Sequence, residues 1–249
     1  MANQEQLALL LQGAEGWNAW RKEHPTEQVD LSEADLRGQG PKILFANLNG
    51  ANLRGANLSN VDVRNVRMPF KGADLTGANL RGAKLEMADL SGANLTAADC
   101  SSAELSMANL TGALLVGAIL QRGEFMRTNF TGAQLSQANF QQARLSSTIF
   151  HGANLTEADL SHVDPAGFLT NISDFTGANL TNAKLTHGLF NPAVKFIAAN
   201  LQGVDFTGAN VATADFTSAN LTGAQITDDQ LKAAFTIEGA TLPDGTKHA

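Results

Sequence analysis

Residues 73–97 read ADLTG ANLRG AKLEM ADLSG ANLTA, five consecutive units of the same five-residue pattern. From Leu75 to Phe190 this step of five continues without a slip, and 21 of its 24 central positions carry leucine or phenylalanine. Alanine lies two residues before the centre in 17 of these units. A period of five fits neither an α-helix nor a β-strand. The sequence therefore predicts a tandem-repeat architecture, in which stacked units share one continuous core.

Units such as residues 78–82 (ANLRG) follow the pattern A(N/D)LxG over roughly residues 29–226. This pattern resembles the pentapeptide-repeat family. The resemblance implies an all-β fold, a right-handed quadrilateral parallel β-helix (a solenoid), in which four units form a coil and coils lie about 4.8 Å apart. The central leucine or phenylalanine then points inward, alanine fills a corner, and the other three positions face water. The tail at residues 240–246 is similar to the ends of many cyanobacterial members.

The two ends of the chain carry helix signals, which divide it into three parts. Residues 1–28 are expected to form an N-terminal capping helix, because the apolar residues of segment 4–22 share one helical face and Asn3 can cap its start. Residues 29–226 form the repeat region. Residues 227–249 form a C-terminal capping helix and tail, since Thr227 and Gln230 have the spacing of a capping box.

Three irregular steps interrupt the period of five. Seven-residue steps predict a loop at residues 37–42 and a bulge at residues 69–71, and a six-residue step predicts a small bulge around residues 191–192. None of them disturbs the apolar centres on either side. We therefore expect short insertions in one continuous solenoid.

Composition favours a binding protein over an enzyme. The net charge of −7 argues against direct binding of nucleic acid, which requires a basic surface. The only cysteine, Cys100, falls on an inward centre and is predicted to be a core residue. The five histidines lack metal-ligand spacing, and His151, His162 and His187 are expected on different faces of the solenoid. We expect no catalytic, metal or cofactor-binding residues, and no enzymatic activity.

The sequence also bounds the cellular location. Its start lacks the basic and apolar segments of a signal peptide, and no stretch has the length of a transmembrane helix. A cytoplasmic location without membrane contact is the expectation.

Arranging the sequence in columns of twenty residues reveals two patterns on the outward positions. One column predicts a ladder of mostly opposite charges, formed by Lys84, Glu104, Glu124, Arg144, Asp164 and Lys184. The next column changes from asparagine and aspartate to the apolar residues Ile149, Leu169 and Leu189, with Ile172 nearby. Such a stripe is typical of a protein interface, although a loop near Pro192 or an irregular coil around residues 165–170 could cover it. Leu114, Val116 and Ile119 form a smaller apolar anomaly elsewhere.

These observations predict a non-enzymatic scaffold that binds an unidentified protein, with a possible regulatory role, as a monomer or a weak homo-oligomer. The alternative comes from the resemblance, because some acidic pentapeptide-repeat proteins mimic DNA and bind gyrase. The modest acidic excess and the mixed charge ladder favour the scaffold.

Overall fold

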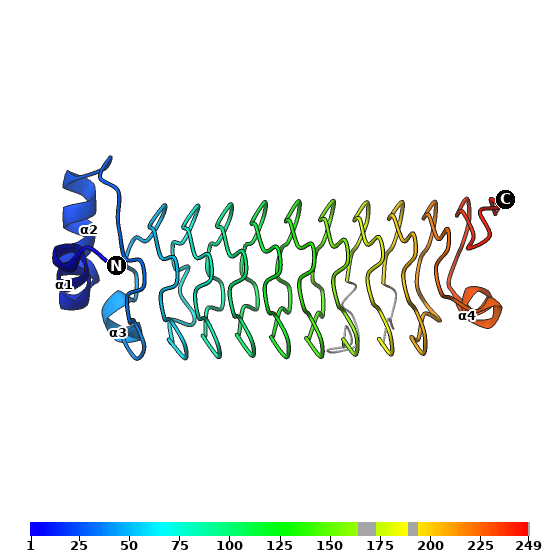
Figure 1. Ribbon diagram of the computed structural model, residues 1–249, viewed down its shortest axis with the longest axis horizontal. Helices are drawn as coiled ribbons and strands as arrows, with labels where there is room; N and C mark the ends of the chain where they lie inside the picture. Colours follow the sequence, from blue (N-terminus) through cyan, green and yellow to red (C-terminus); the bar gives the residue numbers. More distant parts are fainter. Residues whose placement is uncertain (164–172, 189–193, 249) are drawn as a thin grey trace.

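The computed structural model describes residues 1–163, 173–188 and 194–248 and forms an elongated rod (Figure 1). At the N-terminal end lie the helices α1 (Gln4–Gln12), α2 (Ala14–Glu23) and α3 (Gly40–Ile43), and α4 (Asp228–Ala233) lies beside the C-terminus at the other end. Between them, residues of successive coils pair through parallel β-bridges. Because each coil contributes isolated bridging residues, the described part of the rod is a stack of parallel bridges rather than a set of long strands.

The bridges fall into four ladders that run along the rod, and each defines a face. Their central members are Asn94, Leu114 and Gln134 on face A; Asp99, Ile119 and Asn139 on face B; Glu104, Glu124 and Arg144 on face C; and Asn109, Asn129 and Ile149 on face D. Backbone hydrogen bonds join the coils at every ladder. At Leu114, for example, the N–H donates to Ala93 O (2.9 Å) while its carbonyl accepts from Leu95 N–H (2.6 Å).

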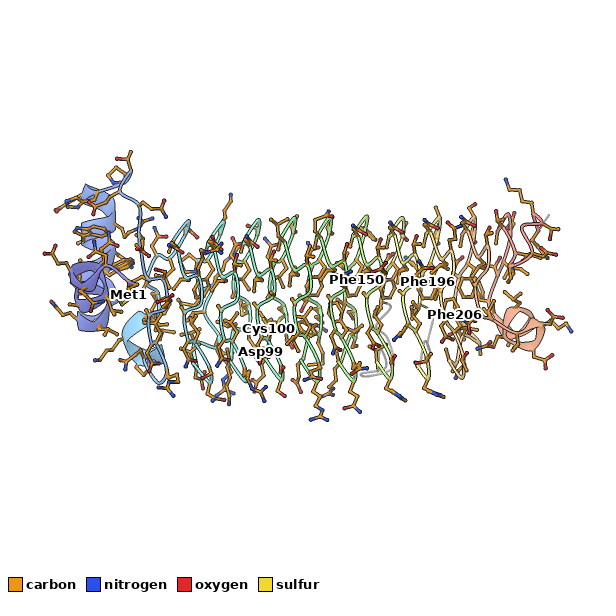
Figure 2. All side chains as sticks on the ribbon, viewed as in Figure 1. Met1, Asp99, Cys100, Phe150, Phe196 and Phe206 are labelled. Atoms are coloured by element: carbon orange, nitrogen blue, oxygen red, sulfur yellow. The ribbon has the colours of Figure 1, made fainter. Side chains whose placement is uncertain are left out.

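The core lies inside the coils, as the repeat pattern predicts. The central leucines and phenylalanines and the alanines two residues before them are buried wherever they are described. In the C-terminal half phenylalanine replaces leucine at many centres, including Phe150, Phe196 and Phe206 (Figure 2). Rings of successive coils stack there, as Phe150 does on Phe175 with centroids 4.6 Å apart. Cys100 is buried as predicted, and burial raises the pKa of its thiol to about 12. Cys100 is therefore a core residue, and its thiol stays protonated at neutral pH.

The N-terminal cap contains two helices, where the sequence predicted one. Helix α1 spans Gln4–Gln12 and α2 spans Ala14–Glu23, and Gly13 between them adopts a φ of 132°, which favours glycine. The break at Gly13 lets α1 and α2 pack against each other. Asn3 caps α1 as predicted, by accepting from the N–H groups of Glu5 and Gln6.

The insertions near the N-terminus also differ from the expectation. The predicted loop at 37–42 includes part of a short helix, α3, at Gly40–Ile43. The predicted bulge at 69–71 is wrong in position, because Pro69 bridges to Asp89 on face D and Phe70 is buried as a regular centre. The extra residues therefore precede Pro69, and Met68 is buried beside Phe70.

The C-terminal cap follows the predicted pattern. Helix α4 spans Asp228–Ala233, and the capping box between Thr227 and Gln230 is present on both sides. The tail then turns back, so that Lys247 forms an antiparallel bridge with Thr241. This pairing covers the last edge of face A, which would otherwise leave backbone groups open.

Coil length varies along the rod, and this changes which residues stack. Linked side chains are 22 residues apart in the first coils and 20 in the middle. They are 25 apart between Ser161 and Thr186, and 21 apart in the coil that follows. The long coil shifts the register of everything after it by five residues.

The predicted charge ladder is therefore correct only in its first part. Lys84 pairs with Glu104 (3.8 Å), and Arg144 pairs with Glu124 (2.9 Å) on face C. Lys184 does not continue this ladder. It lies on face B, where it bridges to Asp159 and Asp205, while Asp164 lies outside the described residues.

Candidate protein interface

The faces of the rod are polar because asparagine and aspartate occupy most of the bridging positions. Their side-chain oxygen accepts the N–H of the second residue onward, as Asn94 Oδ1 does from Thr96 N–H (3.1 Å). This local bond stabilises the turn after each bridge. An apolar residue in such a position loses that bond, so its presence requires another explanation.

Leu114, Val116 and Ile119 break this rule together, in one coil. Leu114 replaces the asparagine of face A, Ile119 replaces the polar residue of face B, and Val116 lies at the corner between them. They are 40%, 38% and 37% exposed, respectively, although they are large and apolar. We call these three residues the corner patch.

The backbone beneath the corner patch has no free hydrogen-bonding groups at its ladder positions. Ile119 N–H donates to Ala98 O (2.9 Å), and Val116 O accepts from Ala97 N–H (2.9 Å). The patch therefore presents its side chains from a fixed backbone. A rigid presentation lowers the entropic cost of binding.

Charged groups border the corner patch on face B. Asp99, one coil before Ile119, pairs with Arg81 at 3.3 Å. Partial burial raises the pKa of Asp99, but hydrogen bonds from Ser101 and Arg81 outweigh it, so the pKa lies below its usual value. An apolar centre with an ionised rim is the usual composition of a protein interface.

The predicted stripe is described only at Ile149. Leu169, Ile172 and Leu189 lie outside the described residues. The predicted stripe requires Leu169 to follow Ile149 in the next coil. This register is wrong, because Ile149 bridges to Asn129 in the coil before it and to Asp174 in the coil after it. The cause is the long coil, which places Asp174 where a coil of twenty residues would place Leu169.

Charged groups lie beside Ile149 on the side of Asp174. Asp174 accepts from His151 (2.9 Å) and lies 3.6 Å from Lys195 Nζ. Burial raises the pKa of Asp174, but bonds from Thr176 and His151 dominate and lower it. Among the described residues, the corner patch is thus the larger apolar surface, although the sequence ranked it second.

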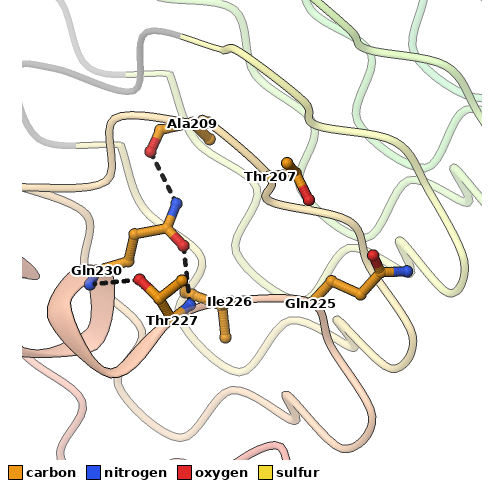
Figure 3. Close-up of a pocket in the computed structure, with 7 residues that line it drawn as sticks. Thr207, Ala209, Gln225, Ile226, Thr227 and Gln230 are labelled. Carbon is orange, nitrogen blue, oxygen red and sulfur yellow. Dashed lines mark hydrogen bonds between the residues drawn. The ribbon is translucent and has the colours of Figure 1, made fainter.

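The rod also carries a shallow cavity of about 570 Å³ beside α4, between Thr207 and the cap (Figure 3). Gln230 holds its wall, because its side-chain amide donates to Phe206 O (2.8 Å) and Ala209 O (2.9 Å) and accepts from Thr227 N–H (2.9 Å). Its described lining contains no ionisable side chain.

Residues 1–163, 173–188 and 194–248 contain no group of three or more histidine, cysteine, aspartate or glutamate side chains placed to hold a metal ion. Within the same ranges, no helix is both long and apolar enough to cross a membrane.

Comparison with known proteins supports the repeat assignment. The model of pentapeptide repeats matches residues 43–68, 70–96, 93–132, 133–164 and 195–228. The comparison with curated proteins gave no significant match.

Among solved structures, the chain is similar to HetL from the cyanobacterium Nostoc sp. strain PCC 7120, a pentapeptide repeat protein involved in heterocyst differentiation regulation. The identity is 27% over 81% of this chain and 94% of HetL, with a TM-score of 0.51. A thylakoid-lumen protein of Arabidopsis thaliana is 32% identical over 55% of this chain and 85% of its own, with a TM-score of 0.31. QnrB1, a fluoroquinolone resistance protein, is 18% identical over 79% of this chain and 86% of its own, with a TM-score of 0.33.

The matched segments cover more than half of the chain and coincide with the bridged coils of the rod. By sequence and by architecture, this protein belongs to the pentapeptide-repeat family.

Proposed function

We propose that this protein is a non-enzymatic scaffold that binds another protein and acts in regulation. The observation that carries the proposal is the corner patch of Leu114, Val116 and Ile119, which are more than a third exposed on faces that are otherwise polar. Similarity to HetL, which is involved in the regulation of heterocyst differentiation, supports a regulatory role. The four ladders and the same similarity support the full fold class, a right-handed quadrilateral β-helix.

The test replaces the corner patch with the residues that the repeat uses elsewhere. Leu114→Asn, Val116→Thr and Ile119→Asn copy Asn94, Thr96 and Asn139, so the rod is expected to fold unchanged. Affinity capture from the source cell, quantified by mass spectrometry, compares the wild type with this triple variant.

Met107→Gln is the matched control. Met107 is 48% exposed at another corner, and glutamine occupies equivalent left-handed corner positions at Gln137 and Gln142. We expect a defined protein to be captured by the wild type and by Met107→Gln and lost from the triple variant. If the captured proteins are the same for all three baits, the patch is not the interface.

The surface predicted around Ile149, Leu169, Ile172 and Leu189 remains a second candidate. Ile149→Asn, Leu169→Asn and Leu189→Asn restore the repeat pattern, and capture with this variant tests it in the same assay. Loss of the partner here, with retention by the corner-patch variant, would move the interface to this surface.

The acidic DNA mimic that binds gyrase is less well supported. A mimic needs continuous rows of negative charge, whereas lysines interrupt the acidic ladders, as Lys184 does between Asp159 and Asp205. A gyrase supercoiling assay tests this alternative, and inhibition at micromolar protein would favour it over the scaffold.

A further inference from the structure

The long coil brings together two histidines that are 25 residues apart in the sequence. The imidazole rings of His162 and His187 stack with their centroids 5.0 Å apart and their planes 16° from parallel. Both residues are exposed and occupy the corner after face B. The sequence predicted different faces for them, because a coil of twenty residues would put His162 over residue 182.

The backbone fixes the positions of both histidines. His162 N–H donates to Thr186 O at 2.9 Å, and the hydroxyl of Thr186 donates to Ser161 Oγ at 3.0 Å. Both histidines have left-handed φ angles, 58° for His162 and 55° for His187. The two side chains therefore project from adjacent coils of a rigid ladder.

The ring nitrogens of this pair are available to a ligand. Within the described residues, neither ring has a hydrogen-bond or ion-pair partner. The other described histidines for which the structure gives a ring contact are engaged: His24 Nδ1 contacts Trp20 O at 2.9 Å, and His151 Nε2 contacts Asp174 at 2.9 Å.

A glycine in the next coil leaves room for the pair. A Cβ atom at Gly208 would lie 2.4 Å from Nδ1 of His187, so the absence of a side chain there is what admits the ring. On the other side, Gln142 accepts from Arg122 Nε at 3.0 Å and is directed away from the histidines by this bond.

We propose that His162 and His187 form a binding site for a divalent transition metal of the class that prefers imidazole, Ni²⁺, Cu²⁺ or Zn²⁺. Neutral imidazole nitrogen is a favoured ligand of these ions, at about 2.0–2.1 Å for zinc. Rings on adjacent coils, about 4.8 Å apart at the backbone, reach a shared ion by rotation about their side-chain torsions. The pair supplies two ligands, and water completes the coordination. This proposal is independent of the protein-binding function.

Titration calorimetry with Ni²⁺ on tag-free full-length protein tests the site. The variants are His162→Asn, His187→Asn and the double variant, since asparagine tolerates the left-handed φ of both positions. His151→Asn is the matched control, because it removes an exposed histidine from another face.

Chelation makes a specific prediction for these variants. Because the second ligand binds an ion that the first already holds, each single substitution is expected to weaken Ni²⁺ binding about tenfold or more, and the double variant, which has no imidazole left in the pair, is expected to lose the site. His151→Asn should retain wild-type affinity. The proposal is overturned if the wild type shows no Ni²⁺ binding, if the single variants bind like the wild type, or if His151→Asn weakens binding as much as they do.

Discussion

Some bridging aspartates both close a turn and contact the neighbouring coil. Asp89, for example, accepts the N–H of Ser91 at 3.2 Å and also the side-chain amide of Asn109 in the next coil at 3.2 Å. Burial raises the pKa of Asp89, but these bonds and the nearby Arg67 lower it by more. The net pKa therefore lies below its usual value, and the carboxylate is ionised in the folded state at neutral pH. Asp74 and Asp99 have the same balance of burial against hydrogen bonds. One carboxylate thus stabilises the turn in its own coil and also contacts the next coil.

These lowered pKa values predict how stability depends on pH. A carboxylate whose pKa is lower in the folded state stabilises the fold above the unfolded value of 3.8, and this contribution is lost as the pH falls through the folded value. We expect the urea midpoint to be nearly constant from neutral pH to about pH 5 and to fall below about pH 4.

The triple variant Asp74→Asn, Asp89→Asn and Asp99→Asn provides the comparison. It keeps the side-chain oxygens that accept the turn hydrogen bonds but removes the titrating groups. Its urea midpoint should fall less between pH 5 and pH 3 than that of the wild type. An equal fall in both proteins would assign the acid sensitivity to other carboxylates.

The caps cover the open edge at each end of the rod, where a terminal coil has no neighbour to pair with. In α1, Gln6 Oε1 accepts from Asp30 N–H (2.8 Å), while Asn3 N–H donates to Asp30 O (2.8 Å). In α2, Trp17 is fully buried, and its indole N–H donates to Asn47 O at 2.9 Å. The helices thus cover the first coil and also satisfy its backbone groups, which prevents end-to-end pairing of rods.

Trp17→Ala is expected to weaken this cap. Loss of a buried tryptophan costs roughly 3–5 kcal/mol, and it also leaves Asn47 O without the indole donor. The free energy of unfolding from urea titration should fall accordingly, and light scattering should detect association of rods. Trp20→Ala is the control, because Trp20 is only partly buried and stacks on His24. A similar loss in both variants would show that Trp17 has no special role in the cap.

Along the whole molecule, stability comes from contacts between neighbouring coils, so a complete coil is an exchangeable unit. The bridge between Glu124 and Arg144 shows that residues 125–144 make up one turn of the rod. Their removal joins Glu124 to Leu145, which then takes the central position of Phe125.

Deletion of residues 125–144 is therefore expected to leave a folded, shorter rod. Small-angle scattering should show a maximum dimension shorter by about 4.8 Å, with cooperative thermal unfolding preserved. Deletion of residues 123–144 is the control, because it leaves two residues instead of four between the centres Leu120 and Leu145. This shorter unit cannot complete a turn, and its variant should lose cooperative unfolding. Equal behaviour of the two variants would contradict the coil as the exchangeable unit.

The sequence by itself determined the local rules of this protein. The period of five, the inward leucines and phenylalanines, the burial of Cys100 and the capping box at Thr227 all depend on residues close together in the chain, and the structure confirms them. The family follows from the same repetition. The exposure of Leu114 and Ile119 could also be anticipated, because each replaces a polar residue within its own unit.

Only the tertiary structure decided which coils stack on which. The step of five continues evenly from Leu75 to Phe190, so the spacing does not reveal the coil that takes 25 residues instead of twenty, although the sequence indicated an irregular coil around residues 165–170. Coil closure depends on pairing between distant residues, whereas periodicity reports only on neighbours. For this reason the sequence placed Leu169 beside Ile149, and the folded chain places Asp174 there and stacks His162 on His187.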